Sequence, residues 1–495
     1  MKTRLSKSRF QKGLQCEKAL WLAVHHPGLA DPVTESKQWI FDQGSGVGVL
    51  AQRLFPDGIE VAEDYRHTPE ALVTTTRLLA EDATTLYEPA FFFDDVLVRV
   101  DILVAAGDGT WDLYEVKSGS RVKPENITDA TVQVYVVEGS GLPIRRAHIV
   151  HLDTSYVWEG SEYDLERLFV IEDVTEAARA KLPEIPALLE SFRDMLAGSE
   201  PQIRIGDRCR KPYDCDFSGH CHDEFSRRDH PITALPRLGE QALHTLLDLG
   251  VIDIREIPDA FGMLSPAQKA VVDVVKSGLP HVDSAALAHE LATLVWPVYH
   301  LDFETVNPAL PLWPGMHPYQ TVPFQYSIHV HHEDGLHEHR EYLHTGSDDP
   351  RRPLAERLIA DLDGSGSVMH YTAFERTRLR ELAHDLPDLA SAIGAVVLRL
   401  VDLESMVRTH TRHPAAAGRS SIKAVLPAWC PDLSYEGLGI PDGSTASALY
   451  LRSLRGELSP AQTAELHADL IEYCGLDTLA MVRLLDVLRE QAGGG

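Results

Sequence analysis

WPVYHLDFET, residues 296–305, is an apolar stretch that ends in two acidic side chains, and it predicts a buried strand with a site at its end. Side chains alternate along a strand with a period of two, so Asp302 and Glu304 point to the same face. Two carboxylates on one face can bind one divalent cation. We therefore expect a domain to begin near residue 296 and this strand to contribute metal ligands.

Two further acidic elements follow in the C-terminal third of the chain. In SVMHYTAFERTRLRELA, residues 367–383, an apolar strand leads to Glu375 at the start of a helix. In DLIEYCGLDTLAMVRLL, residues 469–485, Tyr473 and Asp477 are four residues apart and share one helical face. The sequence thus places acidic side chains on three separate elements of one domain.

This order of motifs resembles that of the DnaQ-like 3′–5′ exonucleases, the DEDD group on the RNase H-like fold, in their tyrosine-containing class. The resemblance implies that Tyr473 orients the attacking water and that Asp402, at another strand end, is a supporting group and an alternative metal ligand. It also implies two Mg²⁺ or Mn²⁺ ions about 4 Å apart. Glu375 stands where the family usually has aspartate. The implied metal ligands are Asp302, Glu304, Glu375 and Asp477.

A second constellation lies in the N-terminal half, where residues 90–117 predict successive strands with a hairpin turn at AAGDGT. Asp101 interrupts one strand, and Glu115 and Lys117 alternate on the next, so their side chains share a face. Asp101 and Glu115 can bind a divalent cation, while Lys117 polarises a water or steadies a phosphate. An exposed hairpin with a Glu and a Lys two residues apart is the simpler interpretation.

This D and ExK pattern, with the SGS that follows it, resembles the PD-(D/E)XK nucleases of the RecB type. The resemblance implies metal binding by Asp101 and Glu115 and catalytic roles for Lys117 and Gln133. Gln133 and Tyr135 match the glutamine and tyrosine of the helix that follows ExK in that group. The relatives often place a metal-binding histidine on an early helix, and residues 41–58 contain none.

Six cysteines in a chain that we expect to be cytosolic favour buried thiols or metal ligands over disulfides. In RecB-like relatives, one cysteine before the nuclease core and three after it bind a 4Fe-4S cluster. The resemblance implies the same role for Cys16, Cys209, Cys215 and Cys221, with zinc as the alternative. We interpret Cys430 and Cys474 as core residues, with Cys474 beside the C-terminal site.

The formal charge is −28, from 46 Lys and Arg residues and 74 Asp and Glu residues. This balance excludes a protein that coats nucleic acid through a broad basic surface, so any nucleic-acid contact must be local. No run approaches the roughly 18 apolar residues of a membrane span, and the start of the chain lacks the apolar core of a signal peptide. We therefore expect a cytoplasmic protein with no membrane contact.

The predicted fold class is mixed α/β, because strands and helices interleave in both halves of the chain. We expect a RecB-like PD-(D/E)XK domain at 1–225 and an RNase H-like domain at 296–490. A helical linker is expected at 226–295, with a helix-hairpin-helix unit as the alternative to a plain linker. This arrangement resembles a bacterial family that joins a RecB-like nuclease domain with cluster cysteines to a DnaQ-like domain.

We expect from these resemblances a metal-dependent nuclease, a phosphodiester hydrolase that acts as an exonuclease on DNA in repair or in defence against foreign DNA. Three alternatives stay open. The chain could degrade RNA. It could bind nucleic acid through a degenerate N-terminal nuclease site with a structural cluster, or it could be an iron-sulfur redox protein, the least favoured because four structural ligands leave no position for a substrate.

Overall fold

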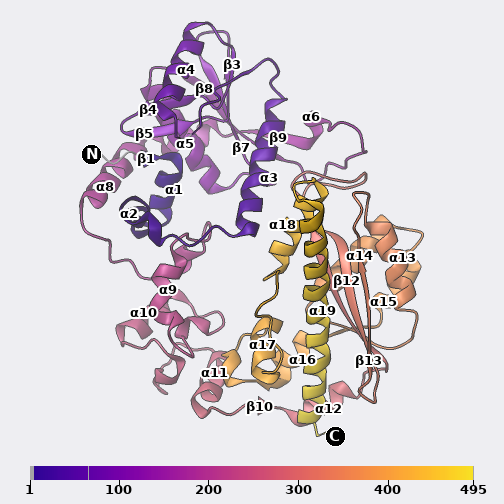
Figure 1. Ribbon diagram of the computed structural model, residues 1–495. Coiled ribbons are helices and arrows are strands. Elements are labelled where there is room, and N and C mark those ends of the chain that lie inside the picture. Colours follow the sequence, from indigo (N-terminus) through magenta and orange to yellow (C-terminus); the bar gives the residue numbers. More distant parts are fainter. Residues whose placement is uncertain (1–4, 65, 494–495) are drawn as a thin grey trace. The chain divides into compact units, whose positions relative to one another are not determined.

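The computed structural model describes residues 5–64 and 66–493, which form two compact units of mixed α/β structure (Figure 1). Unit 1 contains the described residues of Met1–Val33, Lys37–Asp223 and Pro308–Tyr319, and unit 2 contains those of Thr34–Ser36, Glu224–Asn307 and Gln320–Gly495. Residues 226–295 therefore group with the C-terminal sheet. No helix within the described residues is long and apolar enough to cross a membrane.

Unit 1 is built on a six-stranded sheet with the order β2-β3-β6-β7-β8-β9 and a smaller sheet with the order β1-β5-β4. The predicted hairpin at AAGDGT joins the antiparallel strands β6 and β7, and the predicted helix α5 connects β7 to its parallel neighbour β8. The strands are β1 Leu5–Ser6, β2 Ile59–Glu60, β3 Thr85–Tyr87, β4 Ala90–Phe93, β5 Val96–Arg99, β6 Ile102–Ala105, β7 Trp111–Val116, β8 Ile144–Leu152 and β9 Phe169–Asp173.

Helix α5 forms because Pro124 occupies its first turn and the Asn126 side chain accepts from the Lys123 backbone N–H. Its apolar positions, including Val132 and Val136, join the main core of unit 1. The α-helices of this part of the chain, α5 included, are α1 Lys7–Gln15, α2 Glu17–His25, α3 Glu35–Gln52, α4 Thr68–Ala80, α5 Pro124–Gly139, α6 Leu165–Leu168, α7 Thr175–Lys181, α8 Ile185–Ala197 and α9 Ser218–Ser226.

Residues 308–319 follow a strand of unit 2 in sequence but pack within unit 1. Ala309 is 2% exposed and belongs to a core cluster with Val47 and Ile102. The Tyr163 hydroxyl donates to the Pro311 carbonyl at 2.7 Å. Unit 1 is thus completed by a segment that comes late in the chain.

Unit 2 is built on a five-stranded sheet with the order β13-β12-β11-β14-β15. Strands β11, β12 and β13 are antiparallel neighbours, whereas β14 and β15 run parallel to β11. The strands are β11 Val298–Val306, β12 Val322–His331, β13 His337–Leu343, β14 Val368–His370 and β15 Leu400–Asp402. The predicted strand at 296–305 is therefore the central strand of this sheet.

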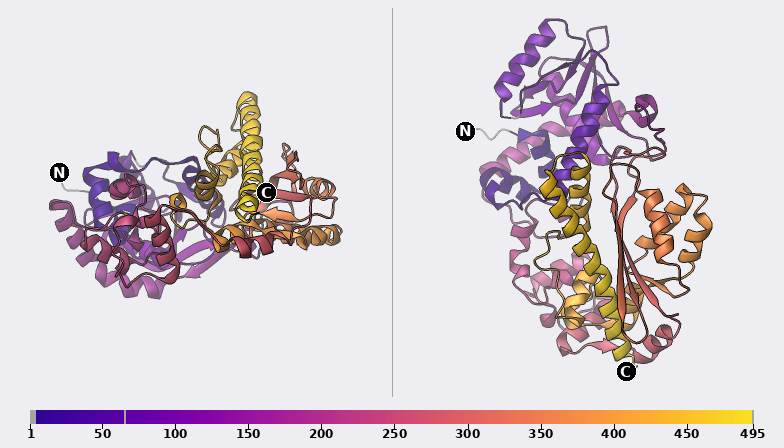
Figure 2. Two further views of the ribbon diagram at one scale, coloured as in Figure 1. Left: turned by 90° about the horizontal axis from the view of Figure 1, so that it is seen from below. Right: turned by 45° about the vertical axis from the view of Figure 1, so that its right-hand side comes forward.

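Alternation along β11 separates an apolar face from an acidic one. Leu301 and Phe303 pack into a core cluster with α13 Arg351–Asp361, α14 Phe374–Asp385 and α15 Ala390–Val397. The long helix α19 packs against β11 and β12, and Figure 2 shows it along the opposite side of the sheet from α13, α14 and α15. Asp302 and Glu304, which alternate with Leu301 and Phe303 along β11, therefore face α19.

Helix α19, Pro460–Gln491, begins with a capping box, in which Ser459 accepts from the Gln462 backbone N–H and the Gln462 side chain accepts from Ser459. Its buried positions recur every three or four residues and include Leu470, Tyr473 and Asp477. Other elements of unit 2 are α10 Glu240–Asp248, α11 Pro266–Ser277, β10 His281–Val282, α12 Ser284–Leu291, α16 Leu403–His410, β16 Thr411–Arg412, α17 Ile422–Trp429 and α18 Gly443–Leu454.

Candidate metal centre

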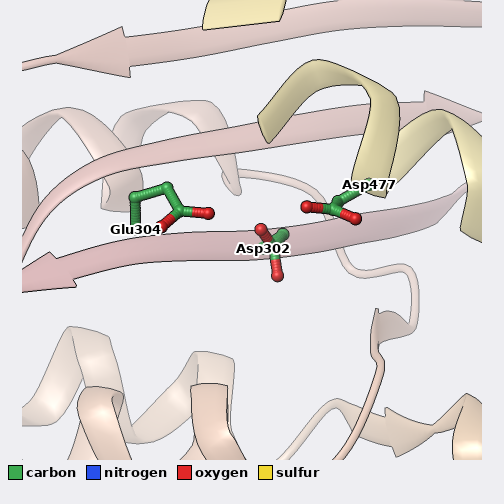
Figure 3. Close-up of side chains that lie close together, drawn as sticks. All are labelled: Asp302, Glu304 and Asp477. Carbon is green, nitrogen blue, oxygen red and sulfur yellow. The ribbon is translucent and has the colours of Figure 1, made fainter. Parts of the chain in front are cut away.

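Asp302 and Glu304 of β11 and Asp477 of α19 bring carboxylate oxygens to within 4.8 Å of one another (Figure 3). We call these three residues the acidic trio. It is the one set of three or more His, Cys, Asp or Glu side chains in the described chain that meets at this spacing. Glu304 is 6% exposed and Asp477 is 8% exposed. Three carboxylates gathered from a strand and a helix fit the oxygen ligands that Mg²⁺ and Mn²⁺ require.

Burial raises the pKa of Asp302 well above its usual value, and the neighbouring Asp477 and Glu375 raise it further. Burial likewise raises the pKa of Glu304 to about 8. The pKa of Asp477 rises only to about 6, because the Tyr435 hydroxyl and the Lys423 ammonium oppose the effect of burial. Burial, with repulsion from neighbouring carboxylates, therefore favours the protonated forms of Asp302 and Glu304 until a cation compensates their charge.

Two polar side chains that we did not predict from the sequence, Tyr435 and Lys423, lie around the acidic trio. The Tyr435 hydroxyl donates to Asp477 Oδ1 at 2.6 Å. Lys423 of α17 donates to the Tyr473 hydroxyl at 3.0 Å and to the Pro441 carbonyl at 2.7 Å. Cys474 Sγ lies 3.6 Å from Asp302 Oδ2, as expected for a cysteine beside the site.

Glu375 lies beside the acidic trio but is not a member of it. It occupies the first turn of α14 and is 3% exposed. Burial raises its pKa to about 8, and Asp402 and Asp477 add to this rise. Its Oε2 atom has no hydrogen-bond partner in the described part of the protein. A buried oxygen of this kind fits a ligand that a cation would complete.

Asp402 is already engaged locally. Its Oδ1 atom accepts from the Ser405 backbone N–H at 2.9 Å and caps the N-terminus of α16. Its remaining effect on the site is electrostatic, since its charge raises the pKa of Glu375. A capping role is the ordinary one for an aspartate at this position of a helix.

The predicted ExK residues of unit 1 also come together, and we call them the ExK centre: Asp101, Glu115, Lys117 and Gln133. Lys117 Nζ lies 2.7 Å from Glu115 Oε1, and Gln133 donates to Glu115 Oε2 at 2.6 Å. Asp101, between β5 and β6, accepts from the Val116 backbone N–H at 2.6 Å. Burial raises the pKa of Asp101 to about 8, and Glu115 adds to this rise.

Two residues that contact the ExK centre, Lys7 and Asp129, were missing from the sequence prediction. Lys7 Nζ lies 2.6 Å from Glu115 Oε1, and Asp129 Oδ2 lies 2.6 Å from Lys117 Nζ. Asp129 precedes Gln133 by one helical turn of α5, a spacing that could have identified it. Tyr135 points elsewhere, because its hydroxyl donates to Asp94 Oδ2 at 2.9 Å.

The four cysteines predicted as cluster ligands line one pocket of unit 1, together with Lys18, Arg204 and Arg208. All six cysteines of the chain, each within the described residues, are free of disulfides. Burial raises the pKa of Cys221 to about 11. The pocket brings Cys16, at the junction of α1 and α2, together with Cys209, Cys215 and Cys221, which come much later in the chain.

Comparison with known proteins gives a match over part of unit 2. No curated protein matches the chain. A family model described as a domain of unknown function (DUF2779) matches residues 299–421. The matched segment contains Asp302, Glu304 and Glu375 and ends before Lys423 and Asp477. Over this segment, which begins on β11, the chain is similar to that family.

Proposed function

We propose that the protein is a divalent-metal-dependent nuclease that hydrolyses phosphodiester bonds at the acidic trio and acts as an exonuclease on DNA. The observation that carries this proposal is the convergence of Asp302, Glu304 and Asp477 within 4.8 Å of one another. When bound, Mg²⁺ or Mn²⁺ would supply Lewis-acid stabilisation and an activated water. The resemblance to DnaQ-like exonucleases supports a role for Tyr473 in orienting the attacking water.

The side chains around the trio suit this chemistry. Because Lys423 donates to the oxygen of Tyr473, the phenolic hydrogen is free to donate to a water or a phosphate oxygen. The Tyr435 hydroxyl fixes one oxygen of Asp477 and leaves the other for a cation. Lys423 thus orients Tyr473 and also lowers the pKa of Asp477 by its charge.

A basic pocket of unit 2 supports a local contact with nucleic acid. Arg419, Ser421 and Lys423 line it, and Lys423 also reaches Tyr473. In a chain with a formal charge of −28, such a pocket can attract one or two phosphates without a broad basic surface. A pocket that contacts one or two phosphates favours binding the end of a nucleic-acid strand over binding along a long duplex.

We also propose that Cys16, Cys209, Cys215 and Cys221 bind a 4Fe-4S cluster that stabilises unit 1. Thiolates on one zinc ion lie about 3.8 Å apart, given a Zn–S bond of about 2.3 Å and tetrahedral geometry. In the described residues, no three of the four sulfurs lie within 4.8 Å of one another. This wider spacing supports a cluster, in which each thiolate binds a different iron atom.

The experiment that tests the proposed function uses anaerobically purified protein and end-labelled single-stranded and duplex DNA and RNA in Mn²⁺. We expect stepwise shortening of DNA, abolished by EDTA and by Asp302→Ala/Glu304→Ala but retained in Glu115→Ala/Lys117→Ala. Shortening of RNA alone would favour the RNA exonuclease. No degradation of any substrate would contradict the proposal and favour a nucleic-acid-binding protein.

Lys423→Met is expected to lower kcat about 10²-fold with little change in KM, because it releases the Tyr473 hydroxyl from its orienting contact. Tyr473→Phe should cause a loss of similar size. The double variant should be no slower than either single one, since both changes remove one shared interaction. Steady-state kinetics on a labelled oligonucleotide measures all three.

The matched control for this cycle is Lys269→Met, which removes an exposed lysine of α11 in the same unit. It should retain the activity of the unsubstituted protein. If the two single losses multiply in the double variant, Lys423 and Tyr473 act independently and the orienting role is wrong.

A further inference from the structure

Lys7 enters the ExK centre from the very beginning of the described chain. Leu5 and Ser6 form β1, which pairs in parallel with Val96 and Leu97 of β5. Leu5 is 1% exposed, so the strand is anchored in the core. Lys7, the first residue of α1, follows directly and extends its ammonium to Glu115 Oε1 at 2.6 Å.

The carboxylate of Glu115 is fully engaged by protein donors. Its Oε1 atom accepts from Lys7 at 2.6 Å and from Lys117 at 2.7 Å, and its Oε2 atom accepts from Gln133 at 2.6 Å. Glu115 is 1% exposed. A cation that coordinates Glu115 Oε1 must therefore displace one of two charge-assisted hydrogen bonds in a buried environment.

The charges around Lys7 are those that would attract a cation. The Lys7 ammonium forms an ion pair with Glu115 at 2.6 Å, and the carboxylates of Asp101 and Asp129 add negative charge around it. Three carboxylates with Lys7 among them form a cation site that already contains a cation supplied by the chain itself.

We infer that Lys7 occupies the cation position of the ExK centre, so that unit 1 binds no divalent metal while Lys7 is in place. Asp101 and Glu115 are then charge partners of the two lysines and not metal ligands. The residues present do not fit a divalent cation beside Lys7, because Lys7 and Lys117 both contact Glu115 Oε1 and Gln133 donates to Glu115 Oε2. This inference concerns unit 1 alone and does not depend on cleavage by unit 2.

The test measures Mn²⁺ binding, by electron paramagnetic resonance and equilibrium dialysis, in the full chain carrying Asp302→Asn/Glu304→Gln to remove the unit 2 ligands. This background should bind no Mn²⁺ that depends on Glu115. Adding Lys7→Met should create one Mn²⁺ site per chain, and adding Glu115→Gln to that variant should remove the site again. Lys7→Arg, which keeps the positive charge, should create none.

Lys181→Met is the matched control, because Lys181 contacts Thr128 of unit 1 and not the ExK centre. It should leave Mn²⁺ binding unchanged. Circular dichroism checks that each variant is folded, and Lys7→Gln replaces Lys7→Met if the latter unfolds. A Glu115-dependent Mn²⁺ site in the presence of Lys7, or no new site in either folded neutral variant, would overturn the inference.

Discussion

Replacing Asp302 with asparagine is expected to reduce Mn²⁺-dependent cleavage by about 10³-fold or more, the scale of losing an essential member of a catalytic unit. Asn retains the shape of Asp but has one carbonyl oxygen and no charge for a cation. Because Asp302 lies within 4.8 Å of two other carboxylates, its loss removes a ligand from the centre of the trio. Initial rates on a labelled oligonucleotide measure the change.

The same substitution should stabilise the metal-free protein at high pH. The folded-state pKa of Asp302 is well above its usual value and that of Glu304 is about 8, so the unfolded chain loses these protons first as the pH rises. The free energy of unfolding therefore falls between about pH 4 and pH 8. Asparagine at 302 cannot ionise, so Asp302→Asn should show a higher Tm than the unsubstituted protein in EDTA at pH 8.

Added Mn²⁺ should raise the Tm of the unsubstituted protein at pH 8 and should raise that of Asp302→Asn much less. Glu465→Gln provides the control, because it neutralises an exposed carboxylate of α19 outside the site. Its rate and Tm should match those of the unsubstituted protein. Equal Mn²⁺ stabilisation of the Asp302→Asn variant would show that the trio does not hold the cation.

Cys209→Ser is expected to abolish iron binding and to lower the Tm of unit 1 by roughly 10 °C, the effect of losing several kcal/mol in a domain of this size. Cys16 and the later Cys209, Cys215 and Cys221 line one pocket, so a cluster would connect segments far apart in sequence. Iron and sulfide analysis of anaerobically purified protein, with calorimetry, measures both effects.

Cys430→Ser makes the same chemical change at a buried cysteine of unit 2 and should retain all of the iron. If the protein contains one zinc ion and no iron, the four cysteines bind zinc and not a cluster. If the protein contains no bound metal, the four cysteines do not stabilise unit 1 through a metal site.

Local periodicity placed all three residues of the acidic trio on their strand or helix. Alternation in WPVYHLDFET correctly placed Asp302 and Glu304 on one face of a strand, and the spacing of Tyr473 and Asp477 placed them on one face of a helix. What this pattern could not provide was the distance of Glu375 from the trio, which depends on how α14 packs against the sheet. The predicted mixed α/β class was confirmed, because hairpins and helix starts have local sequence signals.

The charged neighbours of both centres had no such signal. Lys7 meets Glu115 across 108 residues, and Lys423 meets Tyr473 across 50 residues. A lone lysine in a helix is usually a solvated side chain, so its burial against a carboxylate appears only once the chain is folded. The sequence did not reveal the extent of unit 1 either, because the proline-rich residues 308–319 have the pattern of an ordinary loop between two strands of unit 2.

That late segment determines the order in which the protein can assemble during synthesis. Unit 1 needs Ala309 in its core, so it stays incomplete until the ribosome has passed residue 319. By then β11, which contains two residues of the acidic trio, has already been made and must wait for α19. Unit 1 can therefore still mature before unit 2, but only after residue 319 and not as soon as residue 223 has been made.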